Sequence, residues 1–192
     1  MRLNLVICFV AAAFVLAVGS PSTAIAAERK TSTVYAALDH PANLQALTDR
    51  VAHVVQVEVT EIKTVARPLP VIGGTDVWTE IRGHVTATAK GSLRVGQSIV
   101  CLQHAGKLET NDEIVELLGE IAISTPGEYV VFLNWNAALG SYVVVSSDGI
   151  YSVRQGILHP LGWAPVSEQQ SGRSVSILFD DVRRRVRESI EK

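Results

Sequence analysis

The stretch GEYVVFLNW, from Gly127 to Trp135, constrains the fold of this chain more than any other. Large apolar side chains occupy alternate positions from Tyr129 onward, and Val130 and Phe132 between them are apolar too. A strand with two apolar faces is typical of the centre of a sheet that is covered on both sides. The pattern therefore predicts a core strand, and other parts of the chain must supply the two covers.

The C-terminus is suited to be one of these covers. Residues 174–190 are predicted to form an amphipathic helix, because apolar residues recur at three- and four-residue intervals. Those residues are Val175, Leu178, Phe179, Val182, Val186 and Ile190. Ser171 or Ser174 can cap the helix. We expect this helix to lie against the Phe132 side of the central strand.

Two long segments upstream alternate with the period of strands. Residues 51–60 place valines on one face and polar residues on the other, and residues 76–90 repeat the pattern. Gly83, within the second segment, indicates a bulge or a bend. A third strand is expected over residues 97–103, and residues 141–154 are expected to complete a three-stranded meander with the central strand.

The connections between these strands carry few regular signals. Residues 66–75 contain two prolines and two glycines and are predicted to form a loop with an apolar tip. The acid-rich residues 107–120 lack the spacing of a calcium-binding loop and are predicted to be a solvated excursion. Pro41 is expected to precede a short helix that reaches Arg50.

The N-terminus has the features of a secretory signal peptide. An apolar run of 14 residues follows Arg2, which is too short to span a bilayer. Ala24 and Ala26 supply the small-x-small pattern of a cleavage site. We therefore predict a signal peptide over residues 1–26, a loosely held segment over residues 27–40 and a single domain over residues 41–192, with no transmembrane anchor after cleavage. The alternative is an uncleaved anchor helix.

Charge and cysteine content exclude several classes of function. The chain has a formal net charge of −2 and no basic stripe, so it has little electrostatic reason to bind nucleic acid. Within the run of arginines from Arg183 to Arg187, Arg184 and Arg185 have acids four residues away, which favours a solvated, ion-paired helix face. Cleavage would remove Cys8 and leave Cys101 without a disulfide partner, and its apolar neighbours predict a buried, inert thiol.

No catalytic or metal-binding motif is apparent. The chain has no nucleophile elbow, no phosphate-binding loop and no local His or Cys spacing for a metal, so we expect neither a cofactor nor a metal. Cys101 and His104 lie three apart on a predicted strand and would face opposite sides of the sheet. The chain is interpreted as a protein that is not an enzyme, although a site assembled from distant residues would escape this reasoning.

The order of these features resembles a group of bacterial exported proteins of unassigned function. They share a Lys-Gly pair after the second strand, here Lys90-Gly91, and a Gly-Glu-Tyr-x-x-Phe-Leu segment, here Gly127 to Leu133. The layout is also similar to the netrin-like domain of tissue inhibitors of metalloproteinases. That resemblance covers residues 51–156 and implies a mainly β fold, a small OB-like barrel with a short N-terminal helix and an amphipathic C-terminal helix packed on it. The N-terminal disulfide-clamped cysteine of those inhibitors is missing here, so the resemblance implies fold and not inhibition.

A noncatalytic extracytoplasmic binding domain of bacterial origin, periplasmic or extracellular, is therefore the function we expect, with another extracytoplasmic protein as its partner. Barrels of the OB type generally recognise partners on a sheet face and its loops. The candidate partner-binding residues are large apolar side chains outside the predicted core: Leu69, Ile72, Trp78 and Trp163. The alternatives are a secreted hydrolase without a recognisable motif and a structural component of the envelope.

Overall fold

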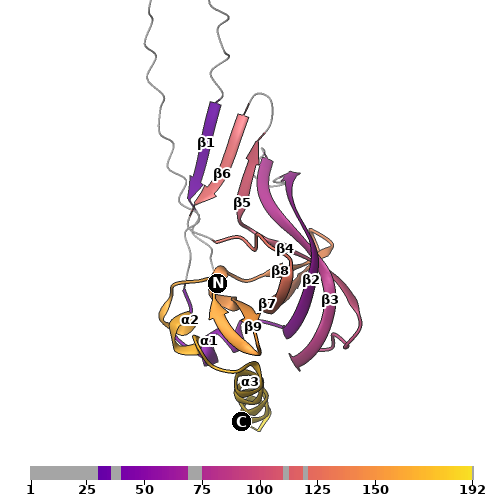
Figure 1. The fold of residues 1–192 in the computed structure, drawn as a ribbon, viewed down its shortest axis with the longest axis vertical. Coiled ribbons are helices and arrows are strands. Elements are labelled where there is room, and N and C mark those ends of the chain that lie inside the picture. The colour runs from indigo at the N-terminus through magenta and orange to yellow at the C-terminus, as the bar shows by residue number, and fades with distance from the viewer. Residues whose placement is uncertain (1–29, 36–39, 69–74, 110–112, 119–120, 192) are drawn as a thin grey trace, which may run out of the picture.

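A computed structural model describes residues 30–35, 40–68, 75–109, 113–118 and 121–191 of the chain (Figure 1). The strands are β1 (Lys30–Tyr35), β2 (His53–Pro68), β3 (Thr75–Lys90), β4 (Ser98–Gln103), β5 (Gly106–Glu109), β6 (Glu113–Leu118), β7 (Gly127–Asn136), β8 (Ser141–Val144), β9 (Ile150–Arg154) and β10 (Ile157–Pro160). The helices are α1 (Leu44–Asp49), α2 (Pro165–Gln170) and α3 (Val175–Ile190), and η1 (Ser147–Gly149) is a turn of 3-10 helix. The fold is mainly β, with a short helix near the N-terminal side and a longer helix at the C-terminus, as predicted.

Seven strands form the main sheet, in the order β10-β9-β7-β2-β3-β4-β8. The β4–β8 pair is parallel, so the sheet is mixed. β8, at one edge of this order, also pairs with the end of β7. The strands β7, β2, β3, β4 and β8 therefore make a partial ring. A separate three-stranded sheet has the order β1-β6-β5.

The central position of β7 is confirmed. Its residues from Gly127 to Leu133 pair with β2, and Val130 and Phe132 are fully buried in one core cluster with residues of α1 and α3. The opposite face of β7 contributes to a second core cluster, in which Tyr129 and Val131 pack with residues of β2, β3 and β4. The two apolar faces seen in the sequence therefore correspond to two cores on either side of one strand.

The bend predicted at Gly83 is confirmed by the pairing of β2 with β3. The register shifts between Val59 and Glu61, which leaves Thr60 as an extra residue opposite Gly83 and Arg82. A Cβ atom at Gly83 would lie 2.2 Å from the carbonyl oxygen of Glu58. Only glycine permits this close approach of the two backbones.

Helix α3 begins after Ser174, whose hydroxyl accepts a hydrogen bond from the Ile177 N–H at 3.4 Å, so the predicted cap is confirmed. Its buried residues are Leu178, Phe179 and Val182. The apolar stripe ends earlier than predicted, because the sheet does not reach the last turn and Ile190 is 78% exposed.

The ion pairs on α3 also differ from the prediction. They join Arg183 to Asp180 and Arg184 to Asp181, at a spacing of three residues rather than four. Arg185 instead donates to the side chain of Gln45 on α1, because the two helices pack against each other. The predicted solvated, ion-paired character of this helix face is confirmed.

Three connections predicted to be irregular contain strands. β1 lies within residues 27–40, β5 and β6 overlap the acid-rich residues 107–120, and β2 continues to Pro68. No strand was predicted at these places, because each strand depends on a distant partner. β6 pairs with β1 in parallel, and the last residues of β2 pair with the start of β3.

The predicted meander is also incorrect in its last step. β9 pairs with β7 and not with β8, as in the contact of Ile150 with Val131. The turn η1 carries the chain away from β8, and Gly149 packs so closely on Phe132 that an added Cβ would lie 2.9 Å from the Phe132 Cβ.

Within the described residues, no helix has the length and apolar character needed to cross a bilayer.

Candidate functional site

The part of β2 and β3 that extends beyond β7 carries a cluster of charged and aromatic side chains on one face. We call this part, Glu61–Pro68 with Thr75–Arg82, the arm. Alternation along the strands places four cross-strand pairs on the same face of the arm. The pairs are Glu61 with Arg82, Lys63 with Glu80, Val65 with Trp78, and Arg67 with Asp76. We call this set the arm face.

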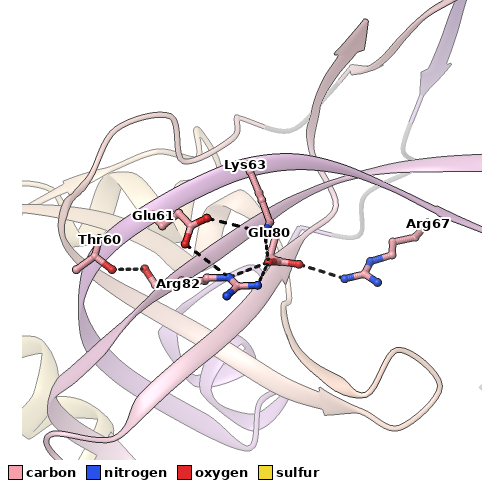
Figure 2. Close-up of polar contacts among 6 residues, drawn as sticks. All are labelled: Thr60, Glu61, Lys63, Arg67, Glu80 and Arg82. Atoms are coloured by element: carbon pink, nitrogen blue, oxygen red, sulfur yellow. Dashed lines mark hydrogen bonds and ion pairs between the residues drawn. The ribbon is translucent and has the colours of Figure 1, made fainter. Parts of the chain in front are cut away.

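Glu80 is the centre of the arm face (Figure 2). Its carboxylate is only 7% exposed, and it accepts hydrogen bonds from Arg82 Nε at 2.9 Å and from Arg67 Nη2 at 3.1 Å. Lys63 Nζ lies 3.2 Å away. Burial opposes the charged form of Glu80, but the hydrogen bonds and positive charge of Arg82 and Lys63 outweigh it, and the pKa of Glu80 is lowered.

This arrangement fixes three long cationic side chains that would otherwise be free to rotate. Glu61 adds a second carboxylate, 3.8 Å from both Lys63 Nζ and Arg82 Nε. The individual ion pairs are exposed on the cationic side and contribute little stability. Their main physical effect is to hold the guanidinium groups of Arg67 and Arg82 in place on the surface before any partner binds.

Trp78 is held in the same face by a second cluster. Its ring centroid lies 4.6 Å from that of His104, with a 36° angle between the planes. His104 Nε2 is 2.7 Å from Asp76 Oδ2. Asp76 is itself fixed, because its other oxygen accepts the Val77 N–H at 2.9 Å.

The four candidate residues predicted from the sequence do not form one described surface. Trp78 is part of the arm face, and Leu69 and Ile72 fall outside the described residues. Trp163 is 63% exposed and lies between β10 and α2. Figure 1 shows α2 with α1 at the opposite end of the sheet from the tip of the arm.

Trp163 belongs to a separate polar cluster around a fully buried carboxylate. The ring of His40 lies 4.7 Å from the ring of Trp163, and His40 Nδ1 is 2.5 Å from Asp148 Oδ2. Asp148 also accepts the Ala164 N–H at 3.2 Å and the hydroxyl of Ser167 at 3.1 Å. A carboxylate and the imidazole that it orients are two of the three groups of a hydrolase triad. The third group would be a hydroxyl that donates to the imidazole, but the hydroxyl of Ser167 is fully buried and donates to Asp148 rather than to His40.

The remaining reactive or ligating groups give no further site. Cys101 is 1% exposed, so the buried position predicted from its neighbours is confirmed, and burial raises the pKa of its thiol to about 12. His104 lies beyond the end of β4, where it contacts Trp78 rather than the region around Cys101. Among the described residues, no group of three or more histidine, cysteine or acidic side chains is placed to hold a metal ion.

Sequence reasoning found part of the arm face. The alternation of β3 placed Trp78, Glu80 and Arg82 on its polar side, as observed. Lys63 and Arg67 were missed because the predicted strand ended at residue 60 and Arg67 was assigned to a loop. The alternation of residues 61–67, with Ile62 and Thr64 on the other face, was the signal that could have extended the strand.

Comparison with known proteins adds no assignment to this geometry. No protein-family profile matches the chain, and no curated protein is significantly similar to it.

Proposed function

We propose that this chain is a noncatalytic extracytoplasmic binding domain that recognises another exported protein through the arm face. The observation that carries the proposal is that Trp78, Arg67 and Arg82 share one face of the arm and are each held in place. Arg67 and Arg82 are held by the mostly buried Glu80, and Trp78 packs on His104, which contacts the buried Asp76. Tryptophan and arginine dominate the residues that contribute most to protein–protein affinity. Side chains that are already ordered lose less conformational entropy on binding.

The composition of the arm face also favours a protein partner over a highly charged polymer. Its cations, Lys63, Arg67 and Arg82, are matched by three carboxylates, Glu61, Asp76 and Glu80. A balanced face has no strong long-range attraction for nucleic acid or for an anionic surface. We further propose that the partial ring corresponds to an OB-type barrel of netrin-like layout, in which a sheet face and its adjoining loop, here containing Leu69 and Ile72, bind the partner.

A photo-crosslinking experiment tests the proposal. A photoreactive phenylalanine analogue at position 78, in protein expressed in its native extracytoplasmic compartment, should crosslink to a discrete partner that mass spectrometry identifies. With the purified partner, Trp78→Ala should weaken binding by about 30-fold or more, the effect of a hot-spot residue of about 2 kcal/mol. Trp135→Ala is the control, because Trp135 is a tryptophan outside the arm face. It is 55% exposed, lies at the end of β7 and packs on Tyr142.

Equal affinity of the Trp78→Ala and wild-type proteins would contradict the proposal. Circular dichroism of each variant distinguishes loss of binding from loss of folding.

A secreted hydrolase is the second candidate, and the His40–Asp148 contact beside the exposed Trp163 is the observation in its favour. A hydrolase would lose turnover of a chromogenic ester or peptide in a His40→Ala variant and would keep it in Trp78→Ala. A structural envelope component, the third candidate, would remain with the insoluble envelope fraction in both variants.

A further inference from the structure

Among the described residues, no strand pairs with the outer edge of the arm, although residues 122–124 and the start of β5 line a cavity together with Ile62 to Thr64. β7 pairs with β2 only as far as Val59, which lies opposite Gly127. From Glu61 to Pro68, within the part of the chain that the structure describes, β2 has β3 as its strand partner on one side and no strand on the other. Such an edge presents backbone N–H and C=O groups to a further strand.

The sequence of this edge is complementary to itself in the antiparallel direction. With Thr64 opposite Thr64 of a second copy, Glu61 lies opposite Arg67 and Lys63 lies opposite Val65. On the other face, Ile62 lies opposite Ala66. Because the relation is two-fold symmetric, the Glu61–Arg67 pair occurs twice and no two like charges are opposed.

Other antiparallel registers can also keep the equivalent faces of the two arms on the same side of the joined sheet. Pairing of the two β2 edges is less favourable in the registers next to the one centred on Thr64. Centring the pair on Val65 places Lys63 opposite Arg67 of the second copy, and centring it on Lys63 places two lysines opposite each other. Centring it on Ile62 would require Val57 and Val59 to pair outward, where β7 already lies. Among the registers centred from Ile62 to Val65, charge and strand occupancy therefore select the one centred on Thr64.

We propose that two copies of the chain associate by antiparallel pairing of their β2 edges around a two-fold axis at Thr64. This inference goes beyond the proposed partner binding and does not depend on it. The pairing extends the ion network across the axis, since Arg67 contacts Glu80 in its own copy at 3.1 Å and faces Glu61 of the other. It also places the two arm faces side by side on one continuous sheet. The contact is a single strand edge, so we expect a weak dimer with a dissociation constant in the micromolar range.

A cysteine on the axis tests the geometry directly. Directly opposite residues of an antiparallel pair have Cβ atoms about 5 Å apart, so a Thr64→Cys protein should form an intermolecular disulfide under mild oxidation. Val95→Cys is the matched control, because Val95 is 68% exposed and lies in the turn before β4. The native Cys101 is buried and does not compete. Equal crosslinking of the two variants, or none of Thr64→Cys, would overturn the proposal.

Charge reversal tests the register in solution. Sedimentation equilibrium should show that Glu61→Arg and Arg67→Glu each raise the dissociation constant at least about tenfold, since each change opposes like charges twice. The double variant Glu61→Arg/Arg67→Glu should restore dimerisation relative to either single variant. Thermal melts monitored by circular dichroism confirm that each variant is folded. A wild-type protein that stays monomeric at all concentrations, or a dimer indifferent to both reversals, would show that this edge does not pair.

Discussion

His53 is a buried titratable side chain without a hydrogen-bond partner for Nδ1 among the described residues. It is 9% exposed, and its ring packs edge-on against Tyr142 at 5.4 Å. Gly91 lies so close that a Cβ there would be 2.1 Å from His53 Nδ1. Burial lowers the pKa of His53 below its ordinary value of 6.5, and the positive charge of Lys90 lowers it further.

Folding stability should therefore depend on pH through His53. In the unfolded chain His53 takes up a proton near pH 6.5, whereas the folded protein resists protonation until a lower pH. Protons thus favour the unfolded state, and the stability present above pH 6.5 is lost as the pH falls toward the folded-state pKa. Urea unfolding at pH 8 and pH 5 should show a smaller loss of stability in His53→Gln than in the wild type.

The matched control for this prediction is His159→Gln, because His159 is exposed on β10. It should retain the wild-type pH dependence. If His53→Gln and the wild type lost the same stability between the two pH values, protonation of His53 would have no part in acid destabilisation.

At the scale of elements, α3 contacts β3 and α1 and contributes to the core cluster on the Phe132 side of β7. Phe132 is fully buried, and its ring lies 6.3 Å from that of Tyr151 on β9. Leu178 and Phe179 of α3 belong to the same cluster. The charged side of α3 faces solvent, where Arg184 is 56% exposed and pairs with Asp181 at 2.7 Å.

Replacement of the buried Phe132 by alanine should therefore lower the free energy of unfolding much more than replacement of the exposed Arg184. Phe132→Ala should reduce the free energy of unfolding by about 3–5 kcal/mol, the range for a buried phenylalanine. Arg184→Ala should reduce it by less than about 1 kcal/mol, because an exposed ion pair contributes little. Chemical denaturation of both variants measures the difference, and a Phe132→Ala protein as stable as the wild type would contradict the central position of this strand.

At the scale of the whole molecule, the described residues form a main sheet with a partial ring, a smaller sheet, and three helices gathered at one end of the main sheet (Figure 1). β1 joins the smaller sheet by pairing in parallel with β6, so a segment near the N-terminus is tied to the middle of the chain. His40 adds a second tie, to the buried Asp148. Lys30–Tyr35 and His40, which follow the proposed signal peptide, thus belong to the fold itself.

Export should leave this part of the chain intact. If residues 1–26 are a signal peptide, N-terminal sequencing of material recovered from the extracytoplasmic fraction should begin at Ala27 or Glu28. Both sites precede β1 and leave its pairing with β6 available. A mature protein that retained residues 5–18 would contradict export by cleavage.

The sequence by itself determined the features that depend on local periodicity. The two-sided strand around Phe132, the alternation of β3 with its bend at Gly83, and the amphipathic α3 with its Ser174 cap were all predicted, because each is encoded within a few consecutive residues. Trp78 was correctly placed on the polar side of β3 for the same reason.

Only the tertiary structure decided the features that join distant segments. β1 and β6 have no strong pattern of their own and are defined by their pairing, and the parallel β4–β8 contact closes the partial ring. The arm face likewise needed the register of β2 on β3 to bring Lys63 and Arg67 to Glu80. Periodicity fixes which side of a strand a residue occupies, whereas its neighbours across the sheet depend on long-range pairing, which a single sequence does not encode locally.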